Sequence, residues 1–270
     1  MKKIAFYGKG GIGKSTTTAN VAAALAQQGY PVCQIGCDPK NDSTRTLLGR
    51  SCPGTVLDLV RKFGDEVAVE ELVHSGFAGV RCVEAGGPEP GVGCAGRGII
   101  VALEKLKELQ ALPEEQITLY DVLGDVVCGG FAVPIREGYA TDIYIVSSGE
   151  LMSLYAANNI AKGVARFAGR SQARLRGIIG NSRNLANEQE LLAAFAERLN
   201  TRLLAFLPWD RIVQQAEIRR KTVIEWAPET DQAEAYRRLA DQVMNNDGGD
   251  IPTPMEFADL EELVLHYGAQ

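Results

Sequence analysis

The segment GKGGIGKS, residues 8–15, stands between a short apolar run and a longer run with helical spacing. It fits the pattern G-x-x-x-x-G-K-[ST], in which backbone N–H groups surround phosphates, a lysine reaches the β- and γ-oxygens and a hydroxyl binds magnesium. Lys14 and Ser15 take those last two roles. The same letters fit the dinucleotide fingerprint G-x-G-x-x-G, which does not require the Lys-Ser pair, and an ordinary glycine turn is the remaining alternative. The strand–loop–helix context favours a phosphate-binding loop.

Around this loop, short β-branched or apolar runs alternate with longer amphipathic runs. The short runs lack alternation between apolar and polar residues, which predicts strands buried on both faces. They are Ile4–Tyr7, Val32–Ile35, Val80–Val83, Ile117–Tyr120, Ile143–Val146, Leu175–Ile179 and Leu203–Phe206. Helical spacing marks Ser15–Gln28, Gly98–Leu109, Leu151–Phe167 and Glu188–Leu199. This order predicts an α/β fold of the P-loop NTPase type, with a mainly parallel sheet and helices on both faces.

The chain has no repeat, low-complexity tract or linker that would divide it, so we expect one domain over residues 1–270. Residues 245–270 form an expected C-terminal extension. It starts with a loop, NNDGGD, and continues into a short helix over Met255–Leu265. We expect this helix to pack on the body of the protein or on a second subunit.

Composition narrows the classes of function. The 270 residues include 46% hydrophobic residues, and the formal net charge of −6 argues against general nucleic-acid binding. The start, MKKIAFYGKGG, has too short an apolar run for a signal peptide or a membrane span, so we expect a cytoplasmic protein without membrane contact. Six cysteines in such a chain indicate thiols or metal ligands rather than disulfides, and two histidines argue against a histidine-based metal site.

Acidic residues follow two of the predicted strands. Asp38 and Asp42 come after the second strand, at the carboxyl end where parallel sheets bind ligands, and either can hold magnesium or a water in its shell. Asp121 and Gly124 form a D-x-x-G pattern after the strand Ile117–Tyr120, which places an acid near magnesium and a backbone N–H near the γ-phosphate. Alone, D-x-x-G is mostly a turn. Behind a buried strand of a phosphate-loop protein, it indicates a nucleotide switch.

Cys94 and Cys128 stand on glycine-rich loops, in PGVGCAGRG and DVVCGG, with no third or fourth cysteine close by. A [4Fe–4S] cluster takes four thiolates, which two identical subunits would supply by giving two each. Glycines suit this role because they let a bulky cluster approach the backbone and leave N–H groups for its sulfurs. Two unrelated loop thiols are the alternative that these residues leave open.

Lys9 is a second lysine inside the phosphate loop. It cannot easily reach the nucleotide of its own subunit, because the loop backbone already surrounds those phosphates, but it can reach a nucleotide held by a facing subunit. A surface lysine is the alternative. GKGGxGKS resembles the signature of the deviant Walker A ATPases, and this resemblance implies a dimer in which Lys9 crosses the interface.

Longer stretches extend the resemblance. GKGGIGKSTTT, GCDPKNDSTR, GGPEPGVGCAGRG, DVLGDVVCGGFAVPIRE, GNSRN and AEIRRKTVIE together resemble the nitrogenase iron protein family over about residues 2–265. The resemblance implies a homodimeric ATPase with one MgATP or MgADP per subunit and one bridging [4Fe–4S] cluster. It also implies a ferredoxin or flavodoxin as electron donor, and a larger catalytic component containing a metallocluster as electron acceptor.

The resemblance also assigns residues. Cys94 and Cys128 match the cluster ligands, and Arg97 matches an arginine that is ADP-ribosylated in some members. Lys9, Lys14, Asp38 and Asp125 are the expected catalytic residues, with Asp125 orienting the attacking water. The expected nucleotide contacts are Gly8, Lys9, Gly10, Gly11, Gly13, Lys14, Ser15 (through magnesium), Thr16, Asp38, Asp42, Asp121, Gly124, Asn181, Pro208, Asp210, Gln214, Glu217 and Gln232.

Trp209 and Gly180 depart from the family's usual residues, which leaves open the reaction that the catalytic partner performs. Related iron proteins serve a methylthio-alkane reductase or a nickel-tetrapyrrole cyclase instead of nitrogen fixation. Two other classes stay open as well. A cargo-positioning ATPase would share the loop and Lys9 without iron, and a carrier that delivers clusters would use a closely spaced cysteine pair.

Overall fold

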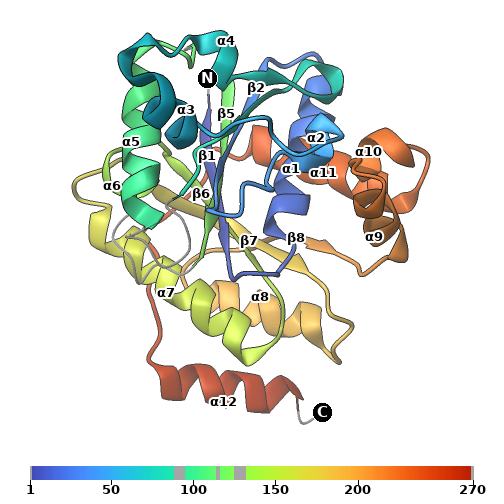
Figure 1. Cartoon of the computed structure of the whole chain (residues 1–270). Coiled ribbons are helices and arrows are strands. Elements are labelled where there is room, and N and C mark those ends of the chain that lie inside the picture. The colour runs from blue at the N-terminus through green and yellow to red at the C-terminus, as the bar shows by residue number, and fades with distance from the viewer. Residues whose placement is uncertain (1, 88–94, 114–115, 125–131, 269–270) are drawn as a thin grey trace.

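The computed structural model describes residues 2–87, 95–113, 116–124 and 132–268, which fold around one twisted sheet (Figure 1). In these residues the sheet has eight strands in the order β3-β4-β2-β5-β1-β6-β7-β8. Every pair is parallel except β3 with β4. The strands are β1 Lys3–Gly8, β2 Val32–Cys37, β3 His74–Ser75, β4 Arg81–Glu84, β5 Ile117–Leu123, β6 Asp142–Ser147, β7 Arg174–Asn181 and β8 Leu203–Leu207.

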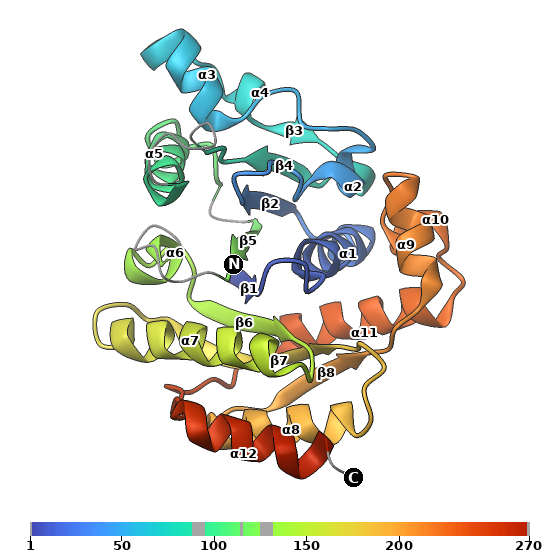
Figure 2. The same ribbon diagram turned by 60° about the horizontal axis from the view of Figure 1, so that its bottom comes forward.

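Helices cover both faces of this sheet, as Figure 2 shows from the second direction. One face carries α3 Val56–Phe63, α4 Val69–Leu72, α5 Ala95–Glu108, α6 Val133–Arg136, α7 Leu151–Phe167 and α8 Glu188–Arg198. The opposite face carries α1 Lys14–Gln27, α2 Arg45–Leu48, α9 Arg211–Ile218, α10 Val223–Trp226 and α11 Asp231–Asn245. Helix α12, Phe257–Gly268, lies outside α7 and α8. Two short 3₁₀ helices, Gly64–Glu66 and Phe77–Gly79, complete the elements.

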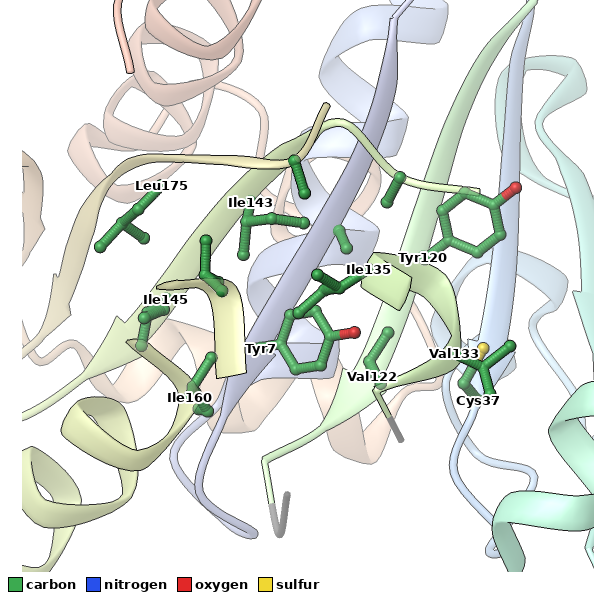
Figure 3. Close-up of a cluster of buried hydrophobic side chains, with 14 of the residues drawn as sticks. Tyr7, Cys37, Tyr120, Val122, Val133, Ile135, Ile143, Ile145, Ile160 and Leu175 are labelled. Atoms are coloured by element: carbon green, nitrogen blue, oxygen red, sulfur yellow. The ribbon is translucent and has the colours of Figure 1, made fainter. Parts of the chain in front are cut away.

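The central strands are buried on both sides because alternate residues enter two separate cores. In β1, Ala5 and Tyr7 face one core while Ile4 and Phe6 face the other, and all four are 0% exposed. Figure 3 shows the first core, where Tyr7 lies among side chains from β5, β6, α6 and α7. Burial on both faces explains the continuous apolar runs, since a strand with one solvent-exposed face would alternate apolar and polar residues.

The predicted fold class is confirmed, and each of the seven predicted strands and five predicted helices corresponds to an observed element. Several elements escaped prediction: the antiparallel edge strand β3, and helices α3, α9, α10 and α11 among others. Strand β3 has two residues, too few to show a period. Helix α11 is mostly polar, with its apolar residues confined to one stripe on α1.

Hydrogen bonds and apolar contacts hold the C-terminal segment on the rest of the chain. Asn158 in α7 exchanges hydrogen bonds with the backbone of Met255: its amide donates to the carbonyl oxygen at 2.8 Å and its Oδ1 accepts from the N–H at 2.9 Å. Helix α12 then buries Leu260 and Leu263 in the core beside α7 and α8. Within the described residues, no helix is long and apolar enough to cross a membrane.

Candidate nucleotide-binding site

The phosphate-loop segment joins β1 to α1 through a backbone that only glycine adopts easily. Gly11 and Gly13 have φ values of 77° and 92°, in the left-handed region. Space is also limited: a Cβ on Gly8 would lie 2.6 Å from the carbonyl oxygen of Val146, and one on Gly13 would meet the amide of Asn181. The loop therefore exposes its backbone N–H groups at the start of α1, as phosphate binding requires.

A chain of buried polar groups leads from this loop into the sheet. Lys14, at the first turn of α1, forms an ion pair with Asp121 of β5; the two side chains are 5% and 0% exposed. The second carboxylate oxygen of Asp121 accepts a hydrogen bond from the Ser43 hydroxyl at 2.6 Å. Gln34 in turn donates to the Ser43 carbonyl and hydroxyl oxygens at 2.9 and 3.0 Å. Strands β2 and β5, helix α1 and the 38–44 loop are thus tied together around one lysine.

A cavity of about 290 Å³ opens beside this lysine. Its wall includes Lys9, Lys14, Ser15, Asp38 and Asp42, which come from the ends of β1 and β2. Burial and the neighbouring Asp38 carboxylate raise the pKa of Asp42 above its usual value. A cation between the two carboxylates would reduce their repulsion. Two carboxylates and one hydroxyl suit Mg²⁺, which completes its coordination with phosphate oxygens and water rather than with an all-protein cage.

No group of three or more His, Cys, Asp or Glu side chains that could hold a metal ion occurs among the residues that the structure describes.

A second pocket, of about 250 Å³, continues from the loop toward α9. It shares Gly11, Gly13, Thr16 and Glu217 with the cavity beside Lys14. The Thr16 hydroxyl donates to the carboxylate of Glu217 and so ties α1 to α9. The remaining wall consists of Asn181, Ser182, Arg183, Pro208, Trp209, Asp210, Val213, Gln214 and Tyr236.

The structure brings most of the predicted nucleotide residues to the carboxyl edge of the sheet. Asn181, Pro208, Asp210, Gln214 and Glu217 all line the second pocket. Gln232 differs: its side chain is 2% exposed, and Tyr236, one helical turn later, forms the α11 part of the pocket wall. Asp125, Cys94 and Cys128 lie outside the described residues. Arg97 lies in α5.

Several residues of the site were not predicted. Arg183 stands two residues after Asn181, which was predicted, and its guanidinium donates to the carbonyl oxygen of Gly11 at 2.5 Å. Ser43 and Thr44 stand in the quoted stretch GCDPKNDSTR, yet their partners are 78 and 40 residues away in the sequence. Such partners follow only from strand order, because the sheet places β5 and β4 on either side of β2.

Glu84, at the end of β4, holds the loop that carries Asp38 and Asp42. One of its carboxyl oxygens accepts hydrogen bonds from the Thr44 N–H at 2.7 Å and from the Thr44 hydroxyl at 2.6 Å. The other oxygen lies against Gly36 and has no hydrogen-bond partner among the described residues. Glu84 is 0% exposed, and burial raises the pKa of this carboxyl from 4.5 to about 8. The buried group is therefore protonated at neutral pH.

Replacing Glu84 by glutamine is expected to remove one source of pH dependence in stability. With its pKa raised in the fold, Glu84 keeps its proton while the unfolded chain releases it, so this contribution is complete below about pH 4.5 and declines until about pH 8. The slope of the free energy of unfolding should differ between wild type and E84Q by up to about 1.4 kcal/mol per pH unit. Urea unfolding at pH 6 and pH 8 measures it, and equal slopes would contradict a neutral Glu84.

The four described cysteines do not have the character of metal ligands. Cys33, Cys37 and Cys82 are 0% exposed, and burial raises the pKa of each thiol, that of Cys33 to about 12. Cys52 is partly exposed, its thiol lies 3.2 Å from the Gly54 carbonyl oxygen, and burial again raises its pKa. With no metal beside them, these thiols stay protonated at neutral pH.

Solved structures with the same fold support the architecture. The septum site-determining protein MinD from Pyrococcus horikoshii OT3, complexed with Mg-ADP, has a TM-score of 0.67 at 22% identity, covering 92% of this chain and 98% of that one. A ParA family ATPase from Chlorobium tepidum TLS has a TM-score of 0.67 at 18% identity, and the match covers 88% of this chain and 97% of that one. Cobyrinic acid a,c-diamide synthase from Mycobacterium smegmatis, with a bound ATP analog and magnesium, has a TM-score of 0.66 at 18% identity. The match covers 89% of this chain and 93% of that one.

These likenesses identify a P-loop NTPase fold and go no further at such identities. The sequence itself is more specific. The profile described as "4Fe-4S iron sulfur cluster binding proteins, NifH/frxC family" matches residues 2–270. Since this match spans nearly the whole sequence, the chain belongs to the NifH/frxC family of iron–sulfur cluster binding proteins.

Proposed function

We propose that this protein is an ATP-dependent one-electron donor that works as a homodimer with one [4Fe–4S] cluster between the subunits. It passes electrons from a ferredoxin or flavodoxin to a larger, metallocluster-containing catalytic component. The observation that carries the proposal is the position of Gly124. This residue packs on the carbonyl of Gly8 in the phosphate loop and stands four residues before Cys128 in the sequence. A change at the phosphates therefore acts at the base of the segment that holds a proposed cluster ligand.

The binding of MgATP is supported by the geometry around Lys14. Its ammonium group is already held by Asp121, so incoming β- and γ-phosphates compete with a carboxylate for the same charge. In the proposed mechanism, the phosphates take over Lys14, the Ser15 hydroxyl and Asp38 or Asp42 hold magnesium, and Asp121 shifts. Ser43, which is bonded to Asp121, transmits this shift to the 38–44 loop.

Hydrolysis needs a positioned water and positive charge, and no covalent intermediate on the protein. We assign the orientation of the water to Asp125. Lys9 lines the cavity beside Lys14, and we propose that it neutralises the phosphates bound by the partner subunit. This would make hydrolysis depend on the dimer.

The proposed cluster ligands are Cys94 and Cys128, which match the ligand cysteines of the nitrogenase iron proteins that this sequence resembles. The other four cysteines are buried or partly buried thiols. Cys94 immediately precedes α5, and Cys128 follows β5 by a few residues. Four ligands then require two copies of the chain. When bound, such a cluster accepts and releases one electron at a time.

Replacing Cys94 or Cys128 by serine should abolish bound iron. Anaerobically purified wild type is expected to contain about four irons per dimer and to show the absorption of a [4Fe–4S] cluster. Either serine variant should lose nearly all of it. Cys52→Ser is the matched control, because it removes a partly exposed thiol outside the proposed ligand set and should leave the iron content unchanged. Iron-free wild type, or full iron in C94S and C128S, would refute the electron-donor function.

One further candidate shares the phosphate loop and Lys9, namely a cargo-positioning ATPase without a cluster. The same iron measurement separates the two, since that class predicts colourless protein. Within the electron-donor class, the catalytic partner is nitrogenase or, alternatively, a methylthio-alkane reductase or nickel-tetrapyrrole cyclase system. Anaerobic co-purification of the native partner, followed by analysis of its metallocluster, distinguishes these.

A further inference from the structure

Trp209 is a large aromatic side chain with little support from the fold. It stands in the turn Pro208–Asp210 between β8 and α9 and is 55% exposed. Among the residues that the structure describes, it takes part in no aromatic pair and no cation–π contact. The other tryptophan, Trp226, is partly buried and has the Arg219 guanidinium 4.4 Å from its ring centre. Trp226 thus stabilises the fold, whereas Trp209 leaves much of its surface free for a ligand.

The free surface of Trp209 lines the second pocket. This pocket and the cavity beside Lys14 share Gly11, Gly13, Thr16 and Glu217, so a single ligand can occupy both. Of the two, only the cavity is lined by Lys14 and Ser15, and only the pocket is lined by Trp209. If the phosphates bind on the loop and the nucleoside enters the pocket, the sugar and base lie on the side of Trp209.

We propose that the indole of Trp209 stacks on the base of the bound nucleotide and so determines affinity for the nucleoside part of ATP and ADP. The inference rests on the proposed nucleotide site and adds a specificity-determining residue to it. Asp210 fixes the start of α9, since its carboxylate accepts a hydrogen bond from the Ile212 N–H at 2.8 Å. The turn that carries the indole is thereby held at the edge of the pocket.

Stacking has a distinctive signature because every base presents an aromatic face. Loss of one stacked aromatic side chain weakens binding by about 5- to 100-fold and depends little on the identity of the base. Phosphate binding needs no stacking. Trp209 should therefore affect ATP and ADP equally and leave inorganic tripolyphosphate unaffected.

The first test uses the fact that the chain has two tryptophans. In W226F, Trp209 is the sole indole, and its emission should be quenched on saturation with MgADP or MgATP and unchanged by magnesium tripolyphosphate. In W209F, where Trp226 is the sole indole, the same titrations should change the emission little. Unchanged emission of W226F with MgADP bound, as measured independently by equilibrium dialysis, would overturn the proposal.

The second test measures dissociation constants for MgADP and magnesium tripolyphosphate by calorimetry. W209A should bind MgADP about 5- to 100-fold more weakly and tripolyphosphate as wild type does, while W209F should restore MgADP binding to within about threefold. The substitution removes a side chain from the surface, so it leaves no cavity in the core. Equal weakening of MgADP and tripolyphosphate binding, or unchanged MgADP binding, would overturn the proposal. In the first test, W226F emission that changes with protein concentration and not with added nucleotide would also overturn it.

These outcomes separate the inference from the function on which it rests. If wild type binds MgADP and W209A binds it equally well, stacking is wrong and the nucleotide site stands. If wild type binds neither MgADP nor magnesium tripolyphosphate, the nucleotide site itself is refuted, together with the role of Trp209.

Discussion

Replacing Lys14 by methionine is expected to slow ATP hydrolysis by about 100- to 1,000-fold, the cost of removing one group that stabilises charge in the transition state. The same change should lower the free energy of unfolding by roughly 3–5 kcal/mol, because it leaves a buried charge without its partner. Lys14 and Asp121 are 5% and 0% exposed, and among the described residues only Ser43 would remain to donate to the carboxylate. Methionine keeps the length of the lysine stem and adds no charge.

A second variant distinguishes lost chemistry from lost stability. In K14M/D121N, the amide removes the uncompensated charge, so most of the stability should return while hydrolysis stays at the K14M level. A double-mutant cycle by urea unfolding gives the coupling between the two residues, and a steady-state phosphate-release assay gives the rate. Hydrolysis by K14M within tenfold of wild type would contradict the role of Lys14. Additive stabilities would contradict the buried ion pair.

The phosphate loop and the parallel strands of the central sheet were predictable because their signals are local. GKGGIGKS fixes a left-handed backbone at Gly11 and Gly13, and no distant residue is needed to recognise it. The strands of the central sheet are continuous apolar runs since both faces are buried. Helix α11 shows the limit: its apolar residues, among them Tyr236, Leu239 and Val243, form a narrow stripe in a polar sequence.

The contacts that connect the site were not predictable, since each joins residues far apart in the chain. Ser43 meets Asp121 across 78 residues, and Thr44 meets Glu84 across 40. Both pairs exist because β2 lies between β5 and β4, an order that the sequence does not print. The burial of Glu84 has the same origin, because nothing in the stretch CVEAGG marks its acid as buried. Local motifs thus identify the parts, and the sheet determines their coupling.

Replacing Gly124 by alanine is expected to uncouple the nucleotide from the segment that follows β5. A Cβ at this position would collide with the carbonyl of Gly8 and lie 2.9 Å from the Lys9 nitrogen. Both are backbone atoms, so one of the two segments must move, and a misfit of this kind typically costs about 1–3 kcal/mol. Gly169→Ala is the matched control. Like Gly124, Gly169 has an ordinary φ, but unlike Gly124 it has open space where its Cβ would stand. Urea unfolding should separate the two variants by that amount.

The functional effect of G124A should exceed its effect on stability. If Gly124 senses the γ-phosphate, the displaced backbone can no longer respond to the difference between ATP and ADP, and the three residues between Gly124 and Cys128 transmit no movement. In wild type and G169A, the midpoint potential of the iron–sulfur centre should then shift when MgATP or MgADP binds, because the hydrogen bonding and exposure of the cluster change. G124A should retain iron but lose most of this shift. A normal nucleotide-dependent shift in G124A would show that the signal reaches the metal centre by another path, such as the 38–44 loop held by Glu84.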